Sequence, residues 1–176
     1  MNVLAMMVLP IALLFGEVNG PPRGEGLPPD FPTKIWVQPV LRELVSQMWQ
    51  TSPTFRRQCQ QVQAQPQIQV QLRIDPTLID NAQHRAVCEL RLYDGGAIIA
   101  RLSVAPIKLP ELIGHEMEHV VERLDGIQVD RESRAQKPGY YVVDSVRRSF
   151  ESDRAIRVGR QVMAEMTQST ALTRRQ

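Results

Sequence analysis

Two of the chain's three histidines lie four residues apart, in the segment His115-Glu116-Met117-Glu118-His119. On an α-helix, residues at positions i and i+4 share one face, so both imidazoles can bind a single Zn²⁺ ion. Glu116 then projects beside the metal, where its carboxylate can take a proton from water and pass it to a leaving amine. The spacing therefore predicts a zinc centre with Glu116 as its general base.

The residues around this motif predict a helix over 111–124 that turns the histidines away from its apolar side. At 100° per residue, the apolar residues lie about 140–200° from His115 around the helix axis. Glycine suits the left-handed position that follows a helix, so Asp125-Gly126 should end it. The alternative is a solvated helix face that binds no metal. The apolar residues are Ile113, Met117, Val120 and Leu124.

This His-Glu-x-x-His helix resembles the active-site helix of the zincin metallopeptidases. In identity the resemblance covers only the motif, and in the order of the expected elements it covers roughly residues 36–166. It implies that His115 and His119 bind zinc and that Glu116 is catalytic. The implied fold class is α+β, a minimal zincin-like domain. It comprises a backing helix, a small mainly antiparallel sheet of about three strands, the motif helix and a C-terminal helix.

A catalytic zinc usually has three protein ligands and a water molecule, so a third ligand is needed. The metzincin pattern HExxHxxGxxH does not match, because Glu122 and Asp125 stand where its glycine and last histidine would be. In gluzincins the third ligand is a glutamate on a later helix, in ExxxD or ExxxA. The segment from Glu151 to Ala155 resembles that pattern and implies Glu151 as the third ligand.

The periodicity of the C-terminal segment supports Glu151 independently. A helix is expected from Asp144-Ser145 to about Met166, and on it Glu151 lies in the middle of the apolar face. A carboxylate buried without a partner is costly, and zinc removes that cost. The alternative is an ion pair between Glu151 and Arg147 or Arg148. The apolar residues within about 40° of Glu151 on that helix are Ala155, Val158 and Val162.

Two further glutamates lie on or near the histidine face of the motif helix. Glu122 lies one turn beyond His119 and is a rival zinc ligand. We expect it instead to orient His119 through a hydrogen bond, as carboxylates commonly do beside metal-bound histidines. Glu118 is expected either to play a similar part or to face water.

Candidates for stabilising the oxyanion are weaker. Tyr140 and Tyr141 could place a phenol near a developing negative charge, and their alternative role is packing. His84 is a further candidate for the same role. Zincin substrates bind by strand addition, so Arg101 and its neighbours are expected to form the sheet edge that pairs with an extended peptide.

Two helices should precede the sheet. A helix starting at Pro39 would run through residues 40–50 and end at Ser52-Pro53, and a second would cover 54–62. The first would bury Val40, Leu41, Leu44, Val45 and Met48, and the second Phe55, Cys59 and Val62.

Three strands are expected between these helices and the motif. Residues 67–74 alternate apolar and polar side chains, which is typical of a strand with one buried face. Residues 86–93 and 97–104 flank Asp94-Gly95-Gly96, whose glycines can supply the positive φ of a tight turn. These two segments therefore predict an antiparallel hairpin.

Length and composition predict one globular domain without a strong net charge. The 176 residues include 21 Lys or Arg and 19 Asp or Glu, for a formal net charge of +2. A hydrophobic content of 43% is that of a globular protein. The small and scattered charge argues against nucleic acid as a partner.

The amino-terminal segment predicts export. Residues 3–15 are uncharged and almost wholly apolar, as in the core of a bacterial-type signal peptide, and are too few to span a membrane. We expect a signal peptide at 1–20, a Pro/Gly-rich linker at 21–35, the zincin-like domain at 36–168 and a frayed tail at 169–176. The expected location is periplasmic or extracellular, with no stable membrane span after processing. The alternative is an uncleaved amino-terminal anchor.

Cys59 and Cys88 are the chain's two cysteines. In an exported protein they could form one disulfide, and the equally weighted alternative is two buried free thiols. Their spacing does not match a zinc ribbon.

The expected function is a zinc-dependent metallopeptidase that hydrolyses a peptide or protein substrate. The alternative from another class is a non-catalytic, zincin-like module that binds a peptide or a cell-envelope component. Glu116 is present, which favours the enzyme. A different zinc hydrolase, such as an amidase acting on a peptide-like bond, is a third possibility.

Overall fold

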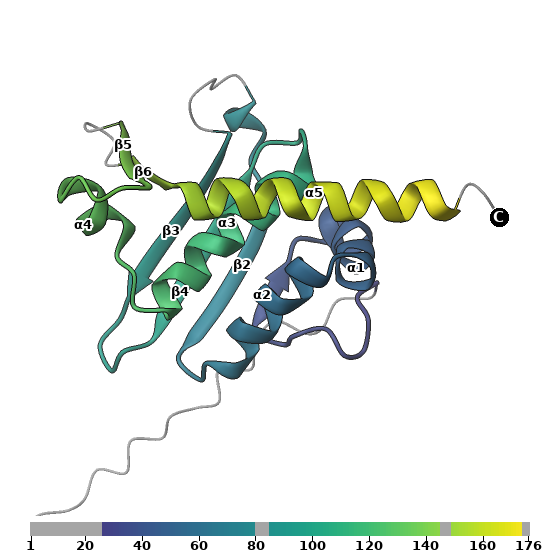
Figure 1. Cartoon of the computed structure of the whole chain (residues 1–176). Helices are drawn as coiled ribbons and strands as arrows, with labels where there is room; N and C mark the ends of the chain where they lie inside the picture. Colours follow the sequence, from purple (N-terminus) through teal and green to yellow (C-terminus); the bar gives the residue numbers. More distant parts are fainter. Residues whose placement is uncertain (1–25, 80–84, 145–148, 174–176) are drawn as a thin grey trace, which may run out of the picture.

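The computed structural model describes residues 26–79, 85–144 and 149–173 (Figure 1). The predicted signal peptide at 1–20, the first part of the linker and the last residues of the tail lie outside this range. The described elements are β1 (Ile35–Val37), a 3-10 turn (Pro39–Leu41), α1 (Arg42–Thr51), α2 (Pro53–Ala64), β2 (Ile68–Ile74), a second 3-10 turn (Pro76–Leu78), β3 (Ala86–Leu92), β4 (Ile98–Val104), α3 (Leu109–Leu124), α4 (Val129–Arg134), β5 (Tyr140–Asp144), β6 (Ser149–Ser152) and α5 (Asp153–Thr173).

The α+β class is confirmed, but the expected sheet is wrong in strand number and direction. In the described part of the chain the main sheet has four strands in the order β1-β2-β4-β3. The ladders of β2 with β1 and with β4 are parallel, and only β3 runs antiparallel to its neighbour. The sheet is mixed because the chain lays β3 on the outside and then returns β4 between β2 and β3. β1 is too short for its alternation to be recognised in the sequence.

The predicted strands themselves are confirmed. In β2, Ile68, Val70 and Leu72 are buried and alternate with more exposed polar side chains. β3 and β4 form the expected hairpin. Its turn uses Gly95 and Gly96 at φ values of 86° and 83°, which side chains with a Cβ rarely adopt.

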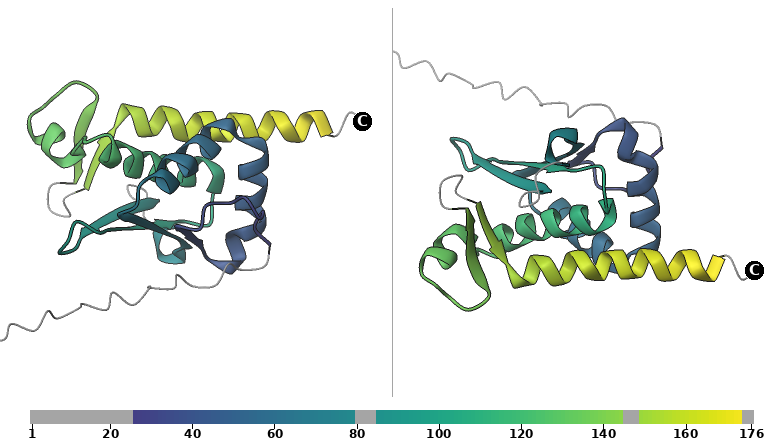
Figure 2. Two further views of the ribbon diagram at one scale, coloured as in Figure 1. Left: turned by 90° about the horizontal axis from the view of Figure 1, so that it is seen from below. Right: turned by 90° about the horizontal axis from the view of Figure 1, so that it is seen from above.

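Helices α2 and α3 cover one face of the main sheet, and α5 lies across the outer side of α3 (Figures 1 and 2). The motif helix therefore lies in the middle layer, between the sheet and α5. Two glycines allow α3 and α5 to approach closely. A Cβ at Gly159 would lie 2.7 Å from the Glu111 carbonyl oxygen, and a Cβ at Gly114 would lie 2.7 Å from a Val162 methyl.

The amino-terminal helices follow the prediction except at Val40. Leu41, Val45 and Met48 are buried as expected, as are the three apolar residues predicted for α2. Val40 is 67% exposed, because the chain forms a 3-10 turn at Pro39–Leu41 before the α-helix begins.

The boundary expected between linker and domain at position 36 is too late. Phe31 and Ile35, which fall in the predicted linker, are 3% and 4% exposed and belong to the core. Phe31 packs edge-on against Trp49, with ring centroids 5.5 Å apart. The packed part of the chain therefore begins before β1.

The carboxy-terminal prediction needs a larger correction. Residues 140–144 and 149–152 form the small β5–β6 hairpin, and α5 begins at Asp153 rather than near Asp144-Ser145. An unpredicted short helix, α4, precedes this hairpin. Glu151 is consequently on a strand, and the helical periodicity that was extended back to it does not apply.

The two cysteines are free thiols: Cys59 is buried in the core and Cys88 is half-buried on β3. Of the two alternatives, the structure therefore has the free thiols and not the disulfide. Across residues 26–79, 85–144 and 149–173, none of the helices combines the length and apolar character needed to cross a membrane.

Candidate metal centre

Helix α3 presents its two histidines away from the apolar side that it packs into the core. The helix begins beside Lys108, which has a positive φ of 45°, and carries Pro110 in its first turn. Ile113, Met117 and Val120 are buried toward the core. The apolar side of the helix is thus fixed against the sheet, and the histidine side faces α5 and the β5–β6 hairpin.

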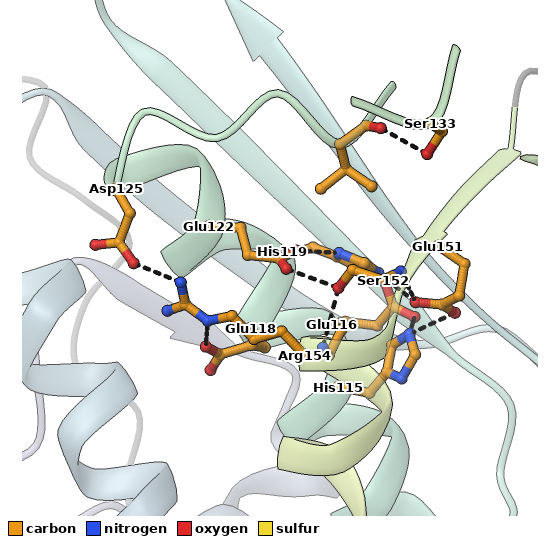
Figure 3. Close-up of polar contacts among 12 residues, drawn as sticks. His115, Glu116, Glu118, His119, Glu122, Asp125, Ser133, Glu151, Ser152 and Arg154 are labelled. Atoms are coloured by element: carbon orange, nitrogen blue, oxygen red, sulfur yellow. Dashed lines mark hydrogen bonds and ion pairs between the residues drawn. The ribbon is translucent and has the colours of Figure 1, made fainter. Parts of the chain in front are cut away.

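Glu151 approaches these histidines from β6, just before the chain enters α5. Its Oε2 lies 3.0 Å from His115 Nε2, and its Oε1 lies 3.3 Å from His119 Nε2 (Figure 3). The three side chains offer ligand atoms that all lie within 4.8 Å of one another. The structure therefore brings together the three residues predicted as ligands, although it places Glu151 on a different element.

The donor set fits a tetrahedral zinc ion. Two imidazole nitrogens and one carboxylate oxygen are the ligands of a common class of catalytic zinc site. At bond lengths of about 2.1 Å, tetrahedral ligands are separated by about 3.4 Å. The two Glu151 oxygens lie 3.0 and 3.3 Å from the nearest histidine nitrogens, close to this value, and one ligand atom from each of the three residues lies within 4.8 Å of the others. A small rearrangement of side chains would accommodate the ion.

The hydrogen bond between His119 and Glu122 gives a second reason to expect a cation. Nδ1 of His119 lies 2.9 Å from Oε2 of Glu122, which is 0% exposed. An ionised carboxylate only accepts hydrogen bonds, so Nδ1 carries the proton and Nε2 of a neutral His119 presents a lone pair. That lone pair faces the Glu151 carboxylate, an arrangement that needs a proton or a metal ion between the two groups.

The pKa shifts of His115, His119 and Glu151 also indicate that this cluster favours a bound positive charge. Burial alone would lower the pKa of His119, but its hydrogen bonds to Glu122 and Glu151 raise that pKa to about 10. Burial would raise the pKa of Glu151, and its hydrogen bonds to the two histidines lower it to about 2. For His115, the effects of Glu151 and Glu116 outweigh burial and raise the pKa.

Glu116 lies beside the three candidate ligands and is not one of them. It is 4% exposed, and its Oε1 lies 3.9 Å from His115 Nε2. Burial raises the pKa of Glu116 despite the nearby histidines. A carboxylate with a raised pKa accepts and holds a proton more readily at neutral pH, which suits a general base.

Ser152 connects α3, which carries the histidines, to the start of α5 next to Glu151. Its role was not predicted from the sequence. Its hydroxyl donates to Glu122 Oε1 at 2.7 Å and accepts from the Ala155 amide at 3.0 Å, so it caps the start of α5 (Figure 3). Glu122 thus holds both His119 and the residue next to Glu151. A helix start at Asp153 would have identified Ser152 as the cap.

Glu118 has neither of its expected roles. It is 2% exposed and accepts hydrogen bonds from Arg154 Nε at 2.6 Å and from Gln58 Nε2 at 2.7 Å. Arg154 also pairs with Asp125 at 2.8 Å. This network ties α3 to α2 and to the first turn of α5, and therefore supports the helix that carries the histidines.

The tyrosine candidates lie on β5. The Tyr141 hydroxyl donates to Asp153 Oδ1 at 2.8 Å, and burial together with Asp153 raises the Tyr141 pKa to about 12. Tyr141 pairs with Glu151 in the hairpin register, and Tyr140 pairs with Ser152. The negative charge of Glu151 also contributes to raising the Tyr141 pKa, so this phenol lies within electrostatic range of Glu151 while its hydrogen bond goes to Asp153. His84, Arg147 and Arg148 lie outside the described residues.

The expected role of Arg101 at the sheet edge is wrong. Arg101 is on β4, which is paired on both sides, by β2 and by β3. Within the described residues the edge strand on this side of the sheet is β3. The prediction placed the edge on the strand that immediately precedes the motif helix, but that strand, β4, lies between β2 and β3.

A cleft of about 730 Å³ lies between β3 and the layer formed by α3 and β6. Glu116, His119 and Glu151 line it, so the candidate metal centre is open to a ligand from this side. The Cys88 thiol also lines the cleft, and burial together with Glu116 and Glu122 raises its pKa. A thiol with a raised pKa remains protonated at neutral pH and is a poor metal ligand.

No protein-family model, curated protein or solved structure matches this chain. The chemistry that the site can perform therefore has to be inferred from its own residues.

Proposed function

We propose that this chain is a zinc-dependent metallopeptidase with a zincin-like arrangement, in which His115, His119 and Glu151 bind Zn²⁺ and Glu116 is the general base. One observation carries the proposal. Two histidines on α3 and a glutamate on β6 place their ligand atoms around one point, and the buried carboxylate of Glu116, which is not one of the candidate ligands, lies beside them. Structural zinc sites are closed by four protein ligands, whereas three ligands leave a position for water.

When bound, Zn²⁺ would polarise a substrate carbonyl and make water a stronger acid. Glu116 takes a proton from the attacking water, and the hydroxide oxygen forms a bond to the carbonyl carbon. Glu116 then gives that proton to the amide nitrogen as the C–N bond breaks, so protons balance over the cycle. Glu122 keeps His119 in the tautomer that directs Nε2 to the metal.

The position of the cleft suits an extended peptide. Its wall includes residues of β3, the edge strand of the sheet, and its floor includes Glu116 and His119. A peptide added beside β3 would hydrogen-bond to the strand along its length and pass the metal centre. The apolar segment at residues 3–15 further supports export to a periplasmic or extracellular location.

The test combines metal analysis with hydrolysis. Zinc stoichiometry is measured by mass spectrometry after dialysis, and cleavage of a mixed peptide library is followed for wild type, Glu116→Gln, Glu151→Gln and the control Glu43→Gln. Glu43 is exposed on α1. We expect Glu116→Gln to retain zinc and lose hydrolysis, Glu151→Gln to lose zinc, and the control to match wild type. A wild type that binds zinc and is as inactive as Glu116→Gln contradicts the proposal and favours the binding module.

A further inference from the structure

The cleft beside the metal centre has apolar walls on two sides. Along β3, Leu90 and Leu92 continue the row of Cys88, line the cleft, and are 39% and 66% exposed. Val143 of β5 and Phe150 of β6 line it as well. Exposed apolar side chains lining a concave surface are typical of a site that binds an apolar group.

Arg123 supplies a positive charge to this apolar cleft. In the part of the chain that the structure describes, it is the only arginine or lysine among the lining residues. It lies four residues beyond His119 on α3, which is roughly 6 Å along the helix axis. Its side chain is partly buried. Arg123 therefore lines the same cleft as His119, about one helical turn further along α3.

The acidic groups near Arg123 have other partners or lie apart from it. Glu122 is bound to His119 and Ser152, and Asp125 is bound to Arg154. Glu89 and Asp130 also line the cleft, but neither forms an ion pair with Arg123 among the described residues. Arg123 thus has five hydrogen-bond donors available in an apolar cleft.

We propose that Arg123 binds a carboxylate of the substrate, so that the cleft takes peptides in which an apolar side chain lies close to a carboxylate. A guanidinium binds a carboxylate through two parallel hydrogen bonds, and a partly buried cleft strengthens that pairing. An extended residue spans about 3.4 Å, so an offset of roughly 6 Å places the carboxylate within about two residues of the cleaved bond. The inference rests on the proposed peptidase site. The carboxylate is either a peptide's C-terminus or an Asp or Glu side chain.

The experiment measures binding without hydrolysis, in zinc-loaded Glu116→Gln. Fluorescence anisotropy follows amino-terminally labelled pentapeptides of Ala and Leu in two sets of matched pairs. The first set compares a free C-terminal carboxylate with the amide. The second compares Glu with Gln at each position of an amidated peptide. We expect the acidic member of at least one pair to bind about tenfold more tightly than its neutral partner.

Adding Arg123→Gln should reduce this preference to less than about twofold, and Arg123→Lys should keep only part of it because an ammonium cannot pair through a planar fork. The matched control is Arg131→Gln, which removes the same charge from exposed α4 next to the cleft-lining Asp130. It should leave the preference unchanged. The pair of peptides that shows the preference identifies the source of the carboxylate.

Equal binding of acidic and neutral peptides overturns the inference. A preference for acidic peptides that survives Arg123→Gln also overturns it, and so does a preference that Arg131→Gln abolishes to the same extent as Arg123→Gln. Zinc content and thermal unfolding of each variant confirm that the site and the fold are intact. The failure of the proposed function is distinguishable. A protein with an Arg123-dependent preference and no hydrolysis by wild type contradicts the peptidase and leaves the carboxylate site standing.

Discussion

The close crossing of α3 and α5 predicts that Gly159→Ala weakens both the fold and the metal centre. The added Cβ would lie 2.7 Å from the Glu111 carbonyl oxygen, 3.0 Å from the His115 Cβ and 3.3 Å from the His115 amide nitrogen. None of these atoms is the end of a flexible side chain. Ordinary contact begins at 3.4 Å, so the helices must separate locally by 3.4 − 2.7 = 0.7 Å.

The expected loss of stability follows from two opposing effects. Overpacking of this kind costs about 1–3 kcal/mol, while replacing glycine by alanine inside a helix returns about 1 kcal/mol. The free energy of unfolding should therefore fall by up to about 2 kcal/mol. Because Glu151 leads directly into α5 and His115 is the residue displaced on α3, the ligands also separate. Metal–ligand distances tolerate only about 0.2 Å, and we expect zinc affinity to fall at least about tenfold.

Denaturant unfolding of the zinc-free protein and titration against a competing chelator measure the two effects. Gly114→Ala is the informative comparison, because the three atoms nearest to its added Cβ all belong to the Val162 side chain. Combining it with Val162→Ala should relieve only part of its strain, because the Val162 Cβ would remain 2.9 Å from the added Cβ, whereas Val162→Ala should not relieve Gly159→Ala at all. If Gly159→Ala is more stable than wild type by the helix-propensity gain alone and binds zinc normally, the helices do not cross as closely as described.

Two further predictions concern the supports of the site. Ser152→Ala should weaken zinc binding about tenfold, because it removes the hydrogen bond that holds Glu122 and the cap at the start of α5. The control is Ser133→Ala, which removes a buried hydroxyl bonded within α4 and should leave zinc affinity within about twofold in the same chelator titration. Hydrogen bonds from Ser52, Thr54 and Gln161 outweigh burial and lower the pKa of Glu165, so its stabilising contribution is complete above pH 4.5 and is lost as the pH falls through the lowered pKa. The free energy of unfolding should therefore fall more steeply with decreasing pH for wild type than for Glu165→Gln. Identical pH profiles of this free energy would contradict a stabilising role for the hydrogen bonds between Glu165 on α5 and the start of α2.

The parts of the fold that could be predicted are those whose patterns are local. The alternation in β2, the glycines between β3 and β4, and the apolar stripe of α3 ending near Gly126 each arise from a few neighbouring residues. These segments were located correctly. The His115–His119 pair was predictable for the same reason, since its geometry depends only on helix periodicity.

The remaining elements depend on distant partners. Ile35–Val37 becomes a strand because β2 supplies its hydrogen bonds, and β5 and β6 stabilise one another. Glu151 was assigned to a helix because the periodicity of α5 continues upstream in the sequence. The cap at Ser152 ends the helix before Glu151, yet the residue still reaches the histidines. The Glu118–Arg154 pair depends on the packing of α3 against α5, which no local pattern encodes.

Zinc K-edge X-ray absorption on the zinc-loaded protein tests the central claim most directly. One ion per chain, with nitrogen and oxygen ligands at about 2.0–2.2 Å and the scattering pattern of two imidazoles, is the predicted result. Glu151→Gln should lose the ion or change this ligand shell. A sulfur ligand at about 2.3 Å would contradict the His115–His119–Glu151 centre, and so would a protein that retains no zinc. Among the residues that the structure describes, Cys88 is the cysteine that lines the cleft and could supply such a sulfur atom.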